Sequence, residues 1–326
     1  MIEVLNNKNS IDISIILLTY NHEKYVVNAL ESILSQDTNY SYEIIVGDDC
    51  STDNTQIILR EYKLKYPDKF ELVLRDNNIG ANKNYFDCEN RAKGRYIASI
   101  EGDDFWIGTE KLQRQAEFLD ENLEYVGVAH QYKTCDEKGN ILPKHKDITF
   151  VRKGIVQFDD LMINSSCYHT STIMYRAKLD YKKNEIYKKI LEYHPVVGDQ
   201  CLRFFLLDSG NVYILPEFWS TFRYVLKKNG TNARSLYKRA PIKSTAILLE
   251  QLLLLQEYFG DRRKITKRIV KKYIRLKYLI IRFGRKFVND SAYAKEVLNR
   301  FPSKYKIVAV IYVPVILFDK IRQAVK

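Results

Sequence analysis

The first hundred residues alternate short runs rich in β-branched side chains with segments of helical period, and this alternation constrains the fold more than any other feature of the chain. Such alternation is typical of βαβ units. The sequence therefore predicts an α/β protein whose mostly parallel sheet is flanked by helices. Strands are predicted at residues 13–18, 42–47, 70–75 and 95–100, and helices at 23–35, after 51–55 and after 78–80.

The pattern changes beyond residue 110. Residues 150–226 have mixed character, although 173–176 resemble a strand, and the chain becomes helical and increasingly basic after residue 235. Further elements are predicted as helices at 111–121, 246–258 and 265–287, and as a hairpin that joins 125–133 to 140–143 around Lys138 and Gly139.

Charge is distributed unevenly along the 326 residues, whose formal net charge is +12. Residues 227–326 hold 25 Lys and Arg against 6 Asp and Glu, whereas residues 1–226 hold 27 against 34. An acidic body with a basic tail indicates two regions. Their boundary is predicted near residue 230, because Asn229 and Gly230 favour a loop.

Cysteine spacing and hydropathy indicate the compartment. The five cysteines lie far apart, with neither zinc-ligand spacing nor a paired framework, which fits a reducing cytoplasm. Residues 1–10 lack the features of a signal peptide. The longest apolar run, residues 307–318, is shorter than the roughly 18–20 residues that span a bilayer. We therefore expect a cytoplasmic protein, with peripheral association at the inner face of the cell membrane as an option.

Two pairs of adjacent aspartates follow predicted strands: Asp48 with Asp49, and Asp103 with Asp104. Each pair by itself is explained by turn and helix-cap chemistry. Ligands of parallel sheets bind outside the carboxyl ends of the strands, where both pairs would meet. Because adjacent carboxylates repel unless a cation lies beside them, the two pairs together predict a pocket for a nucleotide diphosphate and its divalent metal.

Six short segments stand out in the same part of the chain. They are residues 13–22 (ISIILLTYNH), 29–36 (ALESILSQ), 43–55 (EIIVGDDCSTDNT), 78–80 (NIG), 92–97 (AKGRYI) and 101–106 (EGDDFW), the last followed by 111–115 (KLQRQ). In order and spacing they resemble the family 2 inverting glycosyltransferases of the GT-A fold. The resemblance is good over residues 11–130, weaker to about 232 and absent beyond, and it implies a GT-A (Rossmann-like) sheet.

The resemblance implies roles for matching positions. Tyr20 would pack on the nucleotide base, and Asp49 would accept a hydrogen bond from the ring N–H of that base. Asp103 and Asp104 match the DXD-type motif, in which the first contacts the ribose and the second binds the metal that bridges the phosphates. The implied cofactor is Mg2+ or Mn2+, and the implied donor is a nucleotide-sugar, with UDP the expected nucleotide.

The general base is sought in the segment 197–205 (VGDQCLRFF), which resembles the late acidic motif of the family. Inverting transfer needs a base that takes the proton of the attacking hydroxyl, and Asp199 is the predicted base. Its place before an apolar periodic stretch also fits a helix N-cap, and the two roles are compatible. His169 could touch the acceptor or the phosphates, but a histidine at a strand end is more often structural.

The chain departs from the family pattern after Arg223, where many members have a His that is missing here. The departure leaves one metal or phosphate contact unassigned. Arg223, Lys227 and Lys228 are the candidates to neutralise phosphate instead.

The basic tail contains a predicted amphipathic helix. Its apolar residues recur at intervals of four and three, and Lys and Arg occupy most other positions. The apolar side could dock on the catalytic domain, whereas the charges favour an anionic membrane surface; nucleic acid is not expected, because no nucleic-acid-binding motif is present. The apolar stripe consists of Ile269, Tyr273, Leu276, Ile280 and Phe283.

These observations predict a GT-A domain at residues 1–230, with a nucleotide-sugar half at 11–130 and an acceptor half at 131–230, followed by a basic helical region at 231–326. The expected function is metal-dependent transfer of a sugar to a glycan or lipid-linked glycan in cell-surface polysaccharide biosynthesis. A sugar nucleotidyltransferase would show a glycine-rich phosphate loop after the first strand, and residues 19–24 (TYNHEK) contain no glycine. The alternative is a nonenzymatic lipid- or nucleic-acid-binding protein that acts through the basic tail.

Overall fold

The computed structural model of the chain describes residues 10–143, 154–163, 168–180, 185, 187, 189, 198–224, 240–260, 265–286 and 288–306, without the side chains of 161–163, 198–200 and 267. The predictions for Cys167, Lys227, Lys228, the loop at 229–230 and the apolar run at 307–318 lie outside these residues. The chain divides into two compact units: unit 1 comprises residues 1–183 and 195–225, and unit 2 comprises 184–194 and 226–326.

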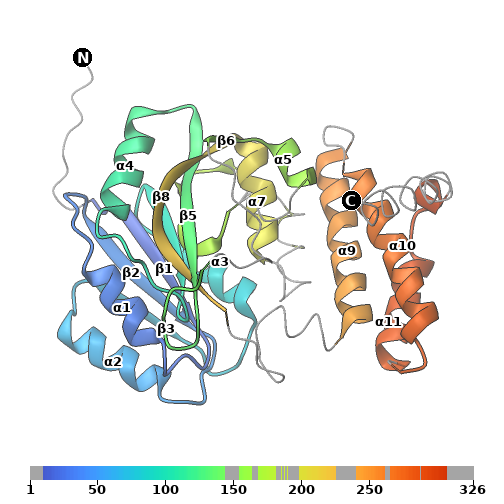
Figure 1. The fold of residues 1–326 in the computed structure, drawn as a ribbon, viewed down its shortest axis with the longest axis horizontal. Coiled ribbons are helices and arrows are strands. Elements are labelled where there is room, and N and C mark those ends of the chain that lie inside the picture. Colours follow the sequence, from blue (N-terminus) through green and yellow to red (C-terminus); the bar gives the residue numbers. More distant parts are fainter. Residues whose placement is uncertain are drawn as a thin grey trace. The chain divides into compact units, whose positions relative to one another are not determined.

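The described part of unit 1 contains an eight-stranded sheet in the order β3-β2-β1-β4-β7-β5-β8-β6 (Figure 1). The first four strands in that order are parallel, β7 lies antiparallel between β4 and β5, and β6 is antiparallel to β8. The mostly parallel α/β sheet predicted from the sequence is therefore confirmed. The strands are β1 Ile13–Thr19, β2 Tyr42–Asp48, β3 Phe70–Leu74, β4 Tyr96–Glu101, β5 Tyr125–Cys135, β6 Gly154–Val156, β7 Met174–Arg176 and β8 Asn211–Arg223.

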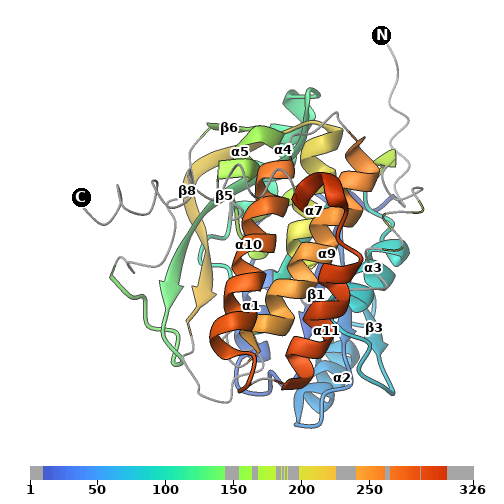
Figure 2. The ribbon, with the colours of Figure 1, turned by 90° about the vertical axis from the view of Figure 1, so that its right-hand side faces the viewer.

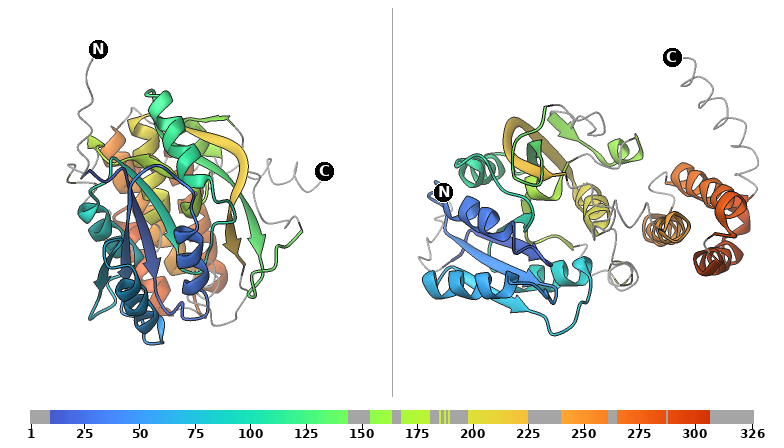
Figure 3. Two further views of the ribbon diagram at one scale, coloured as in Figure 1. Left: turned by 90° about the vertical axis from the view of Figure 1, so that its left-hand side faces the viewer. Right: turned by 60° about the horizontal axis from the view of Figure 1, so that its bottom comes forward.

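Helices cover both faces of the first four strands (Figure 3). Ile13, Ile15 and Leu17 of β1 join a buried cluster with the apolar residues of α1, whereas Gly47 of β2 faces α3. Because β1 is buried on both sides, its sequence is apolar almost without interruption. The helices of unit 1 are α1 Val26–Leu34, α2 Thr55–Lys65, α3 Ala81–Arg91, α4 Lys111–Glu121, α5 Phe158–Ile163 and α7 Gly198–Ser209, with the short 3-10 helix η1 Thr170–Thr172.

The second half of the sheet differs from the sequence prediction. The predicted hairpin is reduced to a turn with a single bridge between Cys135 and Ile141, and β5 pairs instead with β8 in parallel. The long strand β8 is interrupted where Leu215 pairs with His130 and Phe218 pairs with the next residue of β5. Pro216 lies in this bulge, and a proline inside an apolar run argues against a strand, which is why the pattern was ambiguous.

Gly47 allows α3 to approach β2 closely. A Cβ at this position would lie 2.6 Å from Cys88 Sγ and 2.7 Å from Asn84 Oδ1, and the Asn84 side chain also donates to the Gly47 carbonyl. We predict that Gly47→Ala lowers the free energy of unfolding by about 1–3 kcal/mol, because the added methyl overpacks a filled interface. Denaturant unfolding of the variant measures this loss, and a stability equal to wild type would contradict the packing described for α3.

The described part of unit 2 is helical: α9 Pro241–Phe259, α10 Thr266–Phe283 and α11 Val288–Asn299 pack on one another (Figure 2). Ile269, Tyr273 and Leu276 of α10 are buried, as the predicted stripe requires. Ile280 and Phe283 are only partly buried, and Leu279 occupies the buried position instead. Among the described helices, none is long and apolar enough to cross a membrane.

Candidate active site

The carboxyl ends of β1, β2 and β4 bring three sequence motifs to one edge of the sheet. Thr19 pairs with Asp48 across β1 and β2, and Leu18 pairs with Glu101 across β1 and β4. The antiparallel strand β7 begins at this edge, so η1 and His169 before it lie there as well. The expectation that the acidic pairs gather at one edge of the sheet agrees with this topology.

The pair at the end of β2 is well satisfied by the protein. Asp48 is buried and accepts hydrogen bonds from Thr19 Oγ1, the Ser51 amide and hydroxyl, and Gln56 Nε2. Its carboxylate therefore closes the turn between β2 and α2, which is the turn chemistry considered for this pair.

Asp49 holds the segment 78–80 in place. Its two carboxylate oxygens accept the backbone N–H groups of Ile79 at 2.7 Å and Gly80 at 2.9 Å. Gly80 has a φ of +88°, a conformation that favours glycine, and this lets two successive N–H groups converge on one carboxylate. The backbone N–H of Asp49 donates to the carbonyl of Thr19, which places the next residue, Tyr20, close to Asp49 in the chain fold. Tyr20 is partly exposed. The predicted base-binding pair is thus adjacent, with each Asp49 oxygen already accepting one bond.

The second acidic pair has two different environments. Asp103 is partly exposed, and within the described residues no hydrogen bond to its carboxylate is present. Asp104 is 1% exposed; its Oδ1 accepts the Arg223 amide at 2.9 Å and its Oδ2 accepts the Ser171 hydroxyl at 2.7 Å. Burial and the neighbouring Asp103 charge raise the pKa of Asp104 well above its usual range.

Asp104 belongs to a cluster that fits a divalent metal. One ligand atom each from Glu101, Asp104 and His169 lies within 4.8 Å of the other two. Two carboxylates and an imidazole are ligands that Mn2+ accepts, and the carboxylates suit Mg2+. A cation there would also offset the cost of holding ionised Asp104 away from water. The residues present therefore fit the metal that the resemblance implies.

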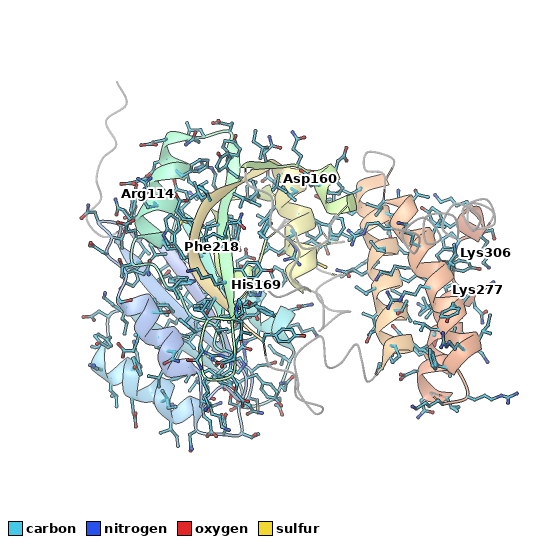
Figure 4. The ribbon with its side chains drawn as sticks, in the orientation of Figure 1. Arg114, Asp160, His169, Phe218, Lys277 and Lys306 are labelled. Carbon is cyan, nitrogen blue, oxygen red and sulfur yellow. The ribbon has the colours of Figure 1, made fainter. Side chains whose placement is uncertain are left out.

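His169 is labelled in Figure 4, and its position is fixed by contacts with four side chains or backbone groups. Its Nδ1 lies 3.6 Å from Asp104 Oδ2 and accepts the Ser171 N–H at 3.3 Å. Its ring packs against Tyr132 and Phe222, with centroids 5.3 Å and 4.9 Å away. Both uses considered for His169 are compatible with this location, since the side chain supports η1 and also lies beside Asp104.

Arg223 stabilises the turn that contains Asp103 and Asp104 by hydrogen bonds to backbone carbonyls. Its Nε donates to the Asp103 carbonyl at 2.6 Å, and its Nη1 donates to the carbonyls of Asp136 and Glu137. The guanidinium also lies over the ring of Tyr25 at 4.6 Å. One nitrogen, Nη2, is buried without a hydrogen-bond partner among the described residues. Arg223 therefore joins the end of β4 to the end of β5, a role beyond the phosphate contact considered from the sequence.

We predict that Arg223→Lys lowers the free energy of unfolding by about 2–4 kcal/mol, because an ammonium cannot reach the three carbonyls that the guanidinium fork satisfies. Thermal unfolding measures the loss. Lys133→Gln, which alters an exposed cation on β5, is the control. Unchanged stability of Arg223→Lys would show that these hydrogen bonds of Arg223 are dispensable.

Asp199 lies in the first turn of α7, and its side chain is outside the described residues. The backbone of α7 is placed by Arg203, one turn later, whose Nη1 donates to the Tyr168 carbonyl at 3.0 Å. Since α7 leads directly into β8, which begins at the opposite edge of the sheet, the first turn of α7 lies at the edge that carries Asp104.

Glu101 is the site residue that the sequence prediction did not assign. It belongs to the segment 101–106 and stands two positions before Asp103, which is the spacing of a DXD-type motif. Ser171 carried no signal, because its contact with Asp104 spans 67 positions of the chain.

Comparison with known proteins agrees with this architecture. Residues 14–182 match the family model described as Glycosyl transferase family 2. The uncharacterized protein Rv1520 of Mycobacterium tuberculosis is 31% identical over 210 residues, which cover 64% of this chain and 58% of that protein. The poly(ribitol-phosphate) beta-N-acetylglucosaminyltransferase TarS of Staphylococcus aureus is 36% identical over 228 residues, covering 69% of this chain and 37% of that protein.

Two solved structures share the fold. TarS 1-349 in complex with UDP-GlcNAc superposes with a TM-score of 0.57 at 21% identity, covering 84% of this chain and 73% of that one. The mannosyltransferase PcManGT of Pyrobaculum calidifontis, in complex with GDP-Man and Mn2+, gives a TM-score of 0.51 at 14% identity, covering 96% of this chain and 83% of that one. These likenesses establish the GT-A fold expected from the sequence.

Proposed function

Because the chain belongs to glycosyl transferase family 2, we propose that it transfers a sugar from a nucleotide diphosphate to an acceptor hydroxyl, with inversion at the anomeric carbon. The observation that carries the proposal is the cluster of Glu101, Asp104 and His169 at the carboxyl ends of the strands, beside the partly exposed Asp103. Open α/β sheets bind their ligands at this edge.

Metal dependence is part of the proposal. A bound divalent cation supplies the positive charge that neutralises the diphosphate as it leaves the sugar. Glu101, Asp104 and His169 would hold Mg2+ or Mn2+, and the contacts of Ser171 and Arg223 fix the Asp104 carboxylate for that task. Support comes from PcManGT, whose structure contains Mn2+.

The donor site extends from this cluster toward β2. The ring of Tyr20 would pack on the base, and a free lone pair of Asp49 would accept the ring N–H of that base. Asp103 would bind the ribose hydroxyls through its carboxylate, which is partly exposed. We propose UDP as the nucleotide, because TarS is related in sequence and was solved with UDP-GlcNAc.

The acceptor would be activated by Asp199. The first turn of α7 lies at the edge of the sheet that carries the metal cluster, and the Arg203 bond to Tyr168 places this helix beside the segment that contains His169. A carboxylate there can take the proton of the attacking hydroxyl while the diphosphate leaves on the opposite side of the anomeric carbon. The acceptor class we propose is a cell-surface glycan, and the name of TarS, a poly(ribitol-phosphate) beta-N-acetylglucosaminyltransferase, supports a polymeric acceptor.

Calorimetric titration with UDP and with GDP, each with and without Mn2+, tests the proposal. We expect UDP to bind with a Kd in the micromolar range and to lose most of its affinity when the metal is chelated. Tyr20→Ala should bind UDP more weakly than wild type, and its UDP binding should depend on the metal as that of wild type does. If neither nucleotide binds, with or without Mn2+, the proposed donor site is wrong.

A further inference from the structure

The helix α10 of unit 2 is strongly basic. Residues 262–289 contain 12 Lys and Arg and no Asp or Glu. Within α10, the buried apolar residues and the exposed charged residues lie on different sides of the helix. Ile269, Tyr273 and Leu276 are buried on the side that packs on α9 and α11. The exposed cations of the helix, which we call the basic face, are Lys271, Arg275, Lys277 and Arg282.

Apolar side chains project from the same side of the helix. Ile281 is 85% exposed and Tyr278 is 51% exposed. Tyr278 lies between Arg275 and Arg282 in the i, i+3 and i+4 series of one helix row, and Ile281 follows Lys277 by one turn. The Arg282 guanidinium lies over the Tyr278 ring, with 5.8 Å to its centroid. An exposed isoleucine and tyrosine among cations form an amphipathic surface rather than a solely hydrophilic one.

Two of the described carboxylates of unit 2 have partners outside α10. Glu250 of α9 pairs with Arg300 and accepts the Tyr293 hydroxyl, and Glu296 of α11 lies near the same Arg300. Within the described residues, Lys271 and Arg275 form no ion pair. Burial, followed by repulsion from Arg275 and Arg268, lowers the pKa of Lys272 to about 8. The helix therefore carries closely spaced positive charges, and a bound anionic partner would reduce the repulsion between them.

We propose that the basic face of α10 binds the anionic headgroups of a lipid surface, with Ile281 and Tyr278 entering the boundary between headgroups and acyl chains. Cations at an anionic leaflet attract its surface charge, while the apolar side chains gain by leaving water. A nucleic-acid backbone would satisfy the cations but would leave Ile281 exposed, so the composition of this surface favours lipid. The inference uses only unit 2 and does not depend on the proposed catalytic function.

Sedimentation of the full chain with vesicles tests the inference. Wild type should bind vesicles that contain phosphatidylglycerol and phosphatidylcholine, bind phosphatidylcholine alone poorly, and lose affinity as salt is added. The triple variant Lys271→Gln, Arg275→Gln and Arg282→Gln should bind roughly 10²-fold more weakly, because each cation near an anionic leaflet contributes severalfold. The matched control, Arg60→Gln with Lys65→Gln and Lys69→Gln, removes three exposed cations of unit 1 and should bind like wild type.

The apolar contribution is tested by Ile281→Ser, which keeps every charge. It should bind the anionic vesicles about tenfold more weakly than wild type, with an unchanged dependence on salt. All of the substituted side chains are exposed, and circular dichroism checks that the helices are retained. Equal binding by wild type and the triple variant would overturn the inference. So would tighter binding to an oligo(U) RNA than to the anionic vesicles, because the basic face would then be a nucleic-acid site.

Discussion

Replacing Asp199 with asparagine is expected to slow sugar transfer by roughly 10²–10⁴-fold while UDP affinity stays close to that of wild type. The amide keeps the size and polarity of the carboxylate but cannot accept the proton of the attacking hydroxyl. Because Asp199 would act on the acceptor and not on the nucleotide, the loss should appear in kcat. Steady-state assays of UDP release, paired with calorimetry, measure both quantities.

A structural role for Asp199 predicts a different result. Asp199 is the second residue of α7 and not its N-cap. Asn has the size of Asp and can also accept a hydrogen bond from the first turn of a helix, so a residue that only stabilises that turn would leave the rate nearly unchanged in Asp199→Asn. Asp208→Asn, which alters a carboxylate near the other end of α7, is the matched control and should retain wild-type kcat. A rate for Asp199→Asn within a factor of two of the control would remove the assignment of the base.

Asp104→Asn is expected to abolish the metal dependence of UDP binding and to lower transfer by roughly 10²–10³-fold, since a site cation is worth several kcal/mol. The stability of the protein should not fall in parallel. Burial and Asp103 raise the pKa of Asp104 in the metal-free fold, so this carboxyl costs stability at pH values above its ordinary pKa, and the neutral amide removes that cost. Thermal unfolding of the metal-free variant should give a Tm equal to or above that of wild type.

Asp48→Asn is the control that distinguishes a loss of stability from a loss of metal binding. Asp48 is also buried at a strand end, but among the described residues it accepts hydrogen bonds from Thr19, Ser51 and Gln56 alone. Its substitution should lower the Tm and leave the metal dependence of UDP binding intact. If Asp104→Asn instead loses stability and keeps its response to Mn2+, the carboxylate serves the fold and the metal cluster is misassigned.

The first half of the fold could be predicted because each of its strands and helices is specified by the pattern of its own residues. The strand at residues 13–18 is apolar on both faces and the helix after it has a clear stripe, so each element shows its own period. The helix predicted at 111–121 has the same bounds in the structure. In α10, Leu279 is buried although it lies outside the predicted apolar stripe, because both α9 and α11 pack on this helix.

The later part was less predictable because its contacts are distant in sequence. β8 is broken by a bulge at Pro216, and its parallel pairing with β5 depends on α7 rather than on any local turn signal. The same limit applies to the site. Asp103 and Asp104 are evident from adjacency, whereas His169 and Arg223 reach them from segments that lie 65 or more positions away, and no pattern within either segment reveals the contact.

A crystal structure with Mn2+ and UDP, with anomalous diffraction recorded at the manganese edge, tests the proposed metal and donor sites most directly. We expect one strong anomalous peak bounded by Glu101, Asp104 and His169, with the diphosphate beside it and the base against Tyr20. A peak elsewhere on the chain, or UDP bound away from the carboxyl ends of β1, β2 and β4, would contradict this expectation.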